Sequence, residues 1–161
     1  MEIEYLNKLE EYLKQNNILE KSGIPLSEIE KLETLNNITF PKAYKEYLTL
    51  TGKYFRPISS TGLSSMFEFV NDKTKMAKAN LKEYGLEKLI TKDFWVIAEM
   101  DGSVFIHYIF LDEGDNPPVY TLDMEGYTEL SDMKDEFYGK TTNSFSDYVE
   151  VYIENYDPNY D

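Results

Sequence analysis

The chain has 161 residues, of which 42% are hydrophobic and 15% aromatic, a composition that supports one packed domain and excludes intrinsic disorder. It contains no cysteine, so a disulfide scaffold and a thiolate metal site are excluded. Its net charge of −14 disfavours nucleic acid and anionic lipid as partners and favours basic proteins.

Two helices are predicted before residue 40 from the spacing of apolar residues. The buried stripe of the first consists of Leu6, Leu9 and Leu13. The second is expected to begin at Ser27, because Ser27 and Glu30 match a capping box that would satisfy two backbone N–H groups. Asn36 and Asn37 end this helix. Its expected buried face consists of Ile29, Leu32 and Leu35.

Two further helices and a short strand are expected before residue 90. Pro41 suits the first turn of a helix, where its missing N–H costs nothing, and Gly52 suits the C′ position after it. The inward residues of this helix are Tyr44, Tyr47, Leu48 and Thr51. Another helix is expected from about residue 71 to residue 84. Met66 to Val70 is predicted to be a short strand.

The second half of the chain changes to the period of a β-strand. Phe94–Ala98 and Ser103–Leu111 are rich in β-branched and aromatic residues, and Asp101-Gly102 between them suits the positive φ angles of a tight hairpin turn. Along Ser103–Leu111 both alternating sets of side chains are largely apolar. We therefore predict a central strand that is covered on both faces.

The chain is expected to end with two more strands and an amphipathic helix. Pro118–Asp123 is predicted as the third strand and Tyr127–Leu130 as the fourth. Ser144 is the predicted cap of the final helix. The apolar face of this helix contains Phe145, Tyr148, Val149, Tyr152, Ile153 and Tyr156. Helices, then an antiparallel meander, then a closing helix indicate an α+β fold with a mainly antiparallel sheet packed by helices.

The sequence offers few groups for catalysis. His107 is the only histidine, and its place on an apolar strand favours a hydrogen-bonded core residue over a general base. No nucleophile elbow, P-loop or dinucleotide-binding motif is present. We therefore predict no enzyme activity, catalytic residue, cofactor or metal. Two alternatives stay open: residues 112–116 could be a cation-binding loop, and a pair of surface carboxylates could serve a hydrolase.

The last third of the chain carries most of the net charge. Residues 112–161 have 14 acids and 2 bases, whereas residues 1–111 have 16 acids and 14 bases. We expect the 112–115 loop and the 123–125 turn to share one edge of the sheet and to form, with the acids that follow, a partner-binding surface. The predicted partner-binding residues are Asp112, Glu113, Asp115, Asp123, Glu125, Asp132, Asp135 and Glu136. The competing interpretation is that each is a solubilising loop acid.

Tyrosines are candidates for interface anchors, because tyrosine offers large area and a hydrogen bond at low entropic cost. The four candidates are Tyr108, Tyr120, Tyr127 and Tyr138. The N-terminus lacks the pattern of a secretory signal, and the longest apolar run, Val104–Leu111, is too short to span a bilayer. A cytoplasmic location without membrane contact is therefore expected, and the sequence carries no signal for an oligomeric state.

Several of these motifs occur together in one order. They are residues 27–33, 40–48 and 51–52, then 95–99, 101–102, 119–120 and 144–145. This order resembles the signature of the SUKH superfamily, which includes yeast cell-wall-assembly regulators and many bacterial immunity proteins. The resemblance covers roughly residues 25–155. The chain departs from the family pattern at Thr51-Gly52 and Gly102-Ser103, and residues 53–90 match little.

The resemblance implies an α+β domain without catalytic apparatus. The whole chain, residues 1–161, would be one SUKH-like domain, with a helical extension at 1–24 and a core at 25–155. Its function would be that of an immunity protein that binds and neutralises a cognate bacterial toxin. An acidic inhibitor suits a basic toxin such as a nuclease-type domain. The alternative is a non-catalytic regulatory or scaffold module that binds other proteins.

Overall fold

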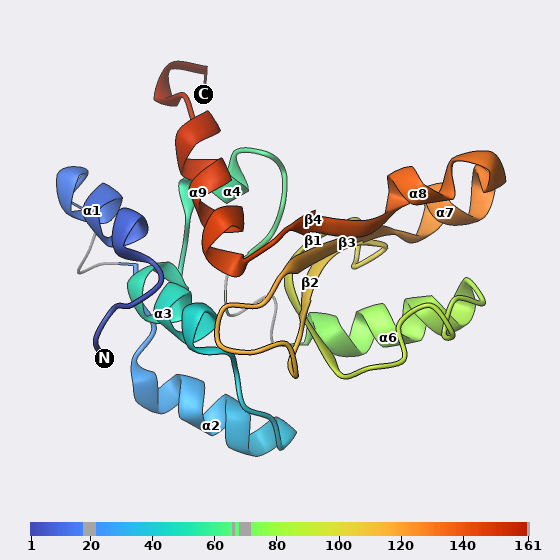
Figure 1. The fold of residues 1–161 in the computed structure, drawn as a ribbon, viewed down its shortest axis with the longest axis horizontal. Helices are drawn as coiled ribbons and strands as arrows, with labels where there is room; N and C mark the ends of the chain where they lie inside the picture. Colours follow the sequence, from blue (N-terminus) through green and yellow to red (C-terminus); the bar gives the residue numbers. More distant parts are fainter. Residues whose placement is uncertain (18–21, 66, 68–71, 161) are drawn as a thin grey trace.

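The protein combines helices with one four-stranded antiparallel sheet of strand order β1-β2-β3-β4 (Figure 1). The structure is a computed structural model and describes residues 1–17, 22–65, 67 and 72–160. The strands are β1 (Phe94–Met100), β2 (Phe105–Phe110), β3 (Val119–Asp123) and β4 (Tyr138–Thr142). The helices are α1 (Asn7–Gln15), α2 (Leu26–Asn36), α3 (Lys42–Thr51), α4 (Arg56–Ser59), α6 (Lys73–Glu83), α7 (Met124–Glu129), α8 (Lys134–Phe137) and α9 (Phe145–Asn155), with 3₁₀ turns η1 (Ser131–Met133) and η2 (Pro158–Tyr160). The predicted α+β class is confirmed.

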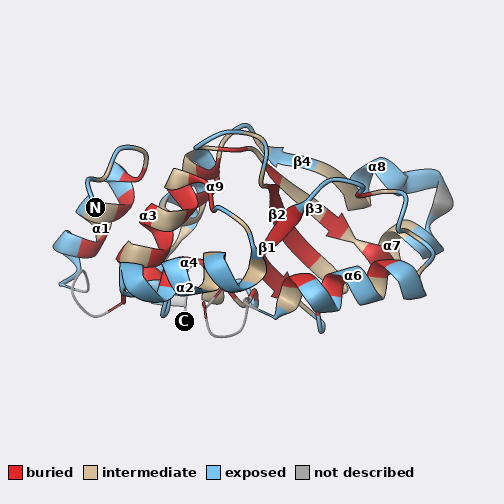
Figure 2. Ribbon diagram, turned by 90° about the horizontal axis from the view of Figure 1, so that it is seen from below, coloured by how far each residue is buried: buried red, intermediate tan, exposed pale blue. Residues whose placement is uncertain are grey.

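The sheet is covered on both faces, and the two hydrophobic cores lie on opposite sides of it (Figure 2). On one face Trp95, Ile97 and Ile109 share a core with α3 and α9, and α1 packs against these two helices. On the other face Ile106 and Tyr108 pack against α6. β2 lies between β1 and β3, so the predicted central strand with two buried faces is confirmed. Among the described residues, no helix is both long and apolar enough to cross a lipid bilayer.

The β1–β2 hairpin has the predicted turn. Asp101 and Gly102 have φ angles of 54° and 65°, and Ser103 follows with 66°. The buried carboxylate of Glu99 stabilises this strained backbone, because it accepts a hydrogen bond from the Ser103 N–H at 2.8 Å. Lys73 on α6 pairs with the same carboxylate at 3.2 Å. The turn is therefore tied to the helix that covers the sheet.

The predicted start and buried face of α2 are partly wrong. The helix begins one residue before Ser27, its N-cap is Pro25, and no side chain caps it, so the capping box does not form. Ile29 is fully buried, as predicted, but Leu35 is 83% exposed. Leu35 is six residues from Ile29, which at 100° per residue places it about 120° around the helix and away from the buried face. The helix ends at Asn36, as predicted, and its C-cap Asn37 adopts the left-handed conformation.

The end of α3 is packed against a segment from before α2. Ile24 donates its N–H to the carbonyl of Leu48 at 2.9 Å, which satisfies a carbonyl in the last turn of α3. Gly52 ends the helix but has a φ of −60°, so the predicted left-handed C′ role is wrong. The glycine is required for space instead. A Cβ there would lie 2.7 Å from the Leu48 carbonyl oxygen, and one on Gly23 would lie 2.0 Å from the Thr49 oxygen.

The predicted fourth strand is wrong, because residues 127–129 belong to α7. Asp123 caps that helix by accepting a hydrogen bond from the Gly126 N–H at 2.9 Å. β4 is the segment after α8 and is the true fourth strand. The strand predicted at Met66–Val70 lies, apart from Phe67, outside the described residues. The predictions of α6 and of α9 with its Ser144 cap are confirmed.

Candidate partner-binding surface

The sheet topology divides the predicted acids into two groups at opposite ends of β3. β2 and β3 are antiparallel, and Phe105 at the start of β2 lies opposite Asp123 at the end of β3. The 112–115 loop joins the other ends of these strands. About 13 Å of strand therefore separates the loop from the 123–125 turn. The expectation that the two segments share one edge of the sheet is wrong.

Two acids of the 112–115 loop, Asp112 and Glu113, are engaged within the protein by their carboxylates. Lys92 Nζ lies 2.8 Å from a carboxylate oxygen of Asp112 and 3.4 Å from one of Glu113. The hydrogen bond to Asp112 raises the pKa of Lys92. Glu113 also accepts a hydrogen bond from the Tyr120 hydroxyl at 3.0 Å. The Asp115 carbonyl accepts the Ala43 N–H of α3 at 2.8 Å, so this loop is held in place by its own contacts.

These contacts also bear on the cation-binding alternative for residues 112–116. Within the described part of the chain, no group of three or more His, Cys, Asp or Glu side chains lies close enough together to hold a metal ion. Lys92 occupies the position between two of the loop carboxylates. The two carboxylates are therefore paired with a lysine, whereas a cation site would need further oxygen ligands at that position.

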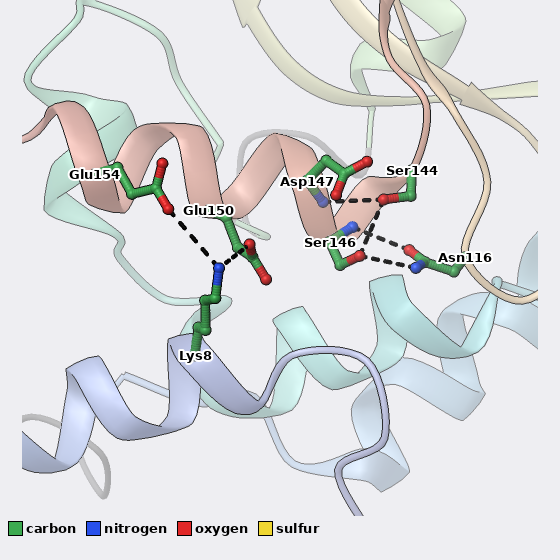
Figure 3. Close-up of polar contacts among 7 residues, drawn as sticks. All are labelled: Lys8, Asn116, Ser144, Ser146, Asp147, Glu150 and Glu154. Atoms are coloured by element: carbon green, nitrogen blue, oxygen red, sulfur yellow. Dashed lines mark hydrogen bonds and ion pairs between the residues drawn. The ribbon is translucent and has the colours of Figure 1, made fainter.

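Acids on α9 are partly neutralised by α1 (Figure 3). Lys8 Nζ lies 2.5 Å from a carboxylate oxygen of Glu150 and 3.8 Å from one of Glu154. At the start of the same helix, the Asn116 side chain donates to the Ser146 hydroxyl at 2.8 Å and accepts its N–H at 3.0 Å. The 112–116 loop and α1 are thus both tied to α9 by polar contacts.

The remaining predicted acids lie on a projecting segment that we call the acidic protrusion, residues 123–137, which contains α7, η1 and α8 (Figure 1). It carries six acids and one base, a net charge of −5. Its exposed acids are Glu125, Glu129, Asp132, Asp135 and Glu136. No ion pair to these five is formed by any residue that the structure describes. Lys134, the one base, lies over the Tyr127 ring at 5.0 Å.

The acidic protrusion also exposes apolar side chains that the sequence reasoning did not single out. Leu130 is 49% exposed and Met133 is 45% exposed. Gly126 lets the segment fold back on itself, because the Phe137 ring lies 2.4 Å from where a Cβ would stand. The strand predicted at Tyr127–Leu130 did not identify Leu130 as exposed, and no prediction was made for Met133.

The four candidate tyrosines differ in exposure. Tyr108 is fully buried in the second core, so its predicted role as an anchor is wrong, and burial raises its pKa. Tyr120 is half-buried and bonded to Glu113. Tyr127 and Tyr138 are half-buried and in edge-to-face contact, with ring centroids 6.1 Å apart. These two support the base of the acidic protrusion.

The only histidine is a core residue, as predicted. His107 is 7% exposed, and its Nδ1 shares a hydrogen bond of 2.7 Å with the Tyr148 hydroxyl of α9. Burial lowers the pKa of His107 to about 4, so the imidazole is neutral at pH 7. The same hydrogen bond holds the Tyr148 side chain of α9 against the sheet.

Comparison with models of protein families identifies the family of the chain. The model of the SMI1 / KNR4 family (SUKH-1) matches residues 23–151, which is more than half of the chain. The matched region begins just before α2 and ends within α9, so it includes the whole sheet and the acidic protrusion. A search of curated proteins finds no match.

Proposed function

Since this chain belongs to the SMI1 / KNR4 (SUKH-1) family, we propose that it is an immunity protein that binds and neutralises a cognate bacterial toxin. The family includes toxin immunity proteins and regulators, and both act by binding other proteins. The proposed mechanism is occlusion, and it requires no catalytic step from this chain.

The observation that carries the proposal is the acidic protrusion. Its five exposed carboxylates form no ion pair with any described residue, in contrast to those that pair with Lys92 and Lys8, and they lie together in one short segment. Unpaired surface charge attracts a partner of opposite sign, and the exposed Leu130 and Met133 supply the apolar area that an interface buries. The protrusion therefore combines the two components of a protein-binding surface.

Charge indicates what kind of toxin would fit. A nuclease presents a basic face, because it must bind the phosphates of its substrate. Exposed carboxylates on the acidic protrusion would bind the same lysine and arginine side chains that otherwise bind phosphate. We therefore propose a basic toxin domain of the nuclease type, whose substrate-binding face is covered in the complex.

The test is calorimetry with the toxin domain encoded by the neighbouring gene. The test variant reverses three acids of the protrusion (Asp132→Lys, Asp135→Lys and Glu136→Lys). The control reverses three exposed acids elsewhere (Glu11→Lys, Glu83→Lys and Glu87→Lys), and both variants carry −8 in place of −14. We expect one-to-one nanomolar binding by the unaltered protein and by the control, with affinity lowered on the order of 100-fold in the test variant.

Two outcomes would contradict this proposal. The absence of binding, or weak binding to several endogenous proteins, would favour the regulatory alternative. An equal loss in both variants would show that net charge matters and the acidic protrusion does not. Reversal of Asp112 and Glu113 is less informative, because it would place new lysines beside Lys92 and disturb the loop itself.

A further inference from the structure

β4 is an open edge of the sheet, whereas the opposite edge, β1, is paired at one residue. At β1, Ser64 exchanges two backbone hydrogen bonds with Glu99, of 2.9 and 3.0 Å. At β4, no other described segment bonds to the backbone on the side away from β3. The strand lies at the rim of the sheet and is exposed or half-buried along its length (Figure 2). The β4 edge therefore offers unpaired backbone groups.

The hydrogen-bond alternation of the sheet shows which groups these are. Met124 donates its N–H to the Val104 carbonyl at 3.0 Å, just beyond the ends of β3 and β2. Antiparallel pairs alternate between bonded and non-bonded, so Leu122 and Tyr120, at steps of two from Met124, also bond to β2. The residue between them, Thr121, therefore directs its backbone groups to β4.

Thr121 lies opposite Gly139 in the β3–β4 register. Gly139 thus uses its N–H and C=O within the sheet, and its neighbours Tyr138 and Lys140 direct theirs outward. A Cβ on Gly139 would have no heavy atom within 4 Å. A register shift lies between Val119 and Tyr120, so the regular alternation of outward groups is limited to Tyr138–Lys140.

The charges around β4 indicate what kind of segment could pair with this edge. The acidic protrusion precedes the strand, and Asp147 in the first turn of α9 follows it. A second copy of this chain would bring the same acids to the edge, which like-charge repulsion disfavours, and the single base of β4, Lys140, is outnumbered by the acids at the two ends of the strand. We propose that an extended, basic segment of the toxin adds to the outer edge of β4 as a fifth strand, with its lysines or arginines against the acids at either end. This inference rests on the proposed function and specifies its geometry.

The test compares two substitutions of one residue. Lys140→Pro removes a backbone N–H that points away from β3, and it leaves the hydrogen bonds between Gly139 and β3 in place. The preceding glycine accommodates the proline ring without a Cβ clash. Lys140→Ala removes the charge and keeps the N–H. We expect both variants to melt close to the unaltered protein, with toxin affinity falling at least about tenfold for proline and less than about threefold for alanine.

Hydrogen exchange on the unaltered protein provides a measurement that does not depend on a variant. The Tyr138 and Lys140 amides should exchange rapidly in the free protein and slowly in the toxin complex. Unchanged exchange of these amides, or equal binding by the two variants, would overturn the strand-addition inference and leave the immunity proposal standing. Failure of the unaltered protein to bind overturns the proposed function itself. A dimer in sedimentation that Lys140→Pro abolishes would assign the edge to a second copy instead.

Discussion

At the residue scale, the most informative side chains are polar groups that the fold buries. His107 lies opposite Ala98 of β1 and Thr121 of β3, beside the Phe105 ring, with the Tyr148 hydroxyl on its Nδ1. No side chain of opposite charge takes part in these contacts. The fold therefore accepts the neutral imidazole and disfavours the imidazolium.

This environment predicts a specific dependence of stability on pH. The unfolded chain binds a proton on His107 below about pH 6.5, and the folded protein does so only near pH 4. The stability that this difference contributes is fully present above pH 6.5. It is lost as the pH falls to about 4, by an amount on the order of 3 kcal/mol. Denaturant titration across this range should show a flatter pH dependence for His107→Gln than for the unaltered protein.

The comparison of the two proteins cancels the many carboxylates that titrate in the same range, because both chains share them. Parallel pH profiles would contradict the assignment of this loss to His107. The core position of His107 could be predicted from the strand pattern. The buried Glu46 could not, because its three hydrogen-bond donors are the backbone N–H groups of residues 4, 5 and 6, about 40 residues away.

At the element scale, some local signals in the sequence predicted the structure correctly and others did not. The Asp101-Gly102 turn, the two-sided pattern of β2 and the Ser144 cap depend on neighbouring residues only, and all three are confirmed. The Ser27 capping box failed because Pro25 begins the helix earlier. The strand expected at 127–130 failed because Asp123 caps a helix there, and a short apolar run is ambiguous between helix and strand.

The contact between Gly23 and α3 gives a prediction at this scale. A methyl group on Gly23 would stand 2.0 Å from the Thr49 carbonyl oxygen, so either the 22–24 segment or the end of α3 must move. Gly23→Ala should therefore lower the free energy of unfolding by at least about 2 kcal/mol, as substitutions that force backbone apart generally do. Gly139→Ala is the matched control. Its Cβ has free space, so denaturant unfolding should show a change of less than about 0.5 kcal/mol. Similar free energies of unfolding for the two variants would show that the 22–24 segment can move at little cost in free energy.

At the scale of the whole molecule, pairing decides which of the acids are free to act. The sequence placed a net charge of −12 in residues 112–161. It could not show that Lys92 neutralises the 112–113 acids or that Lys8 neutralises those on α9, because the lysines come from distant parts of the chain. The five exposed acids of the acidic protrusion have no such lysine among the described residues, and the fold gathers them in one projecting segment.

Free surface charge should act chiefly on the rate of toxin capture. Exposed charges interact over about 10 Å at 0.1 M salt and over only about 3 Å at 1 M, so the attraction between the acidic protrusion and a basic toxin is screened as salt rises. Stopped-flow association between 0.02 and 0.5 M salt should show at least a tenfold fall in on-rate, with little change in off-rate. The Asp132, Asp135 and Glu136 reversal should flatten this dependence more than the Glu11, Glu83 and Glu87 reversal does, although both change net charge equally. Identical slopes for the two variants would mean that the protein attracts its partner through its total charge, whereas a steeper slope in the control would localise the attraction to the protrusion beside β4.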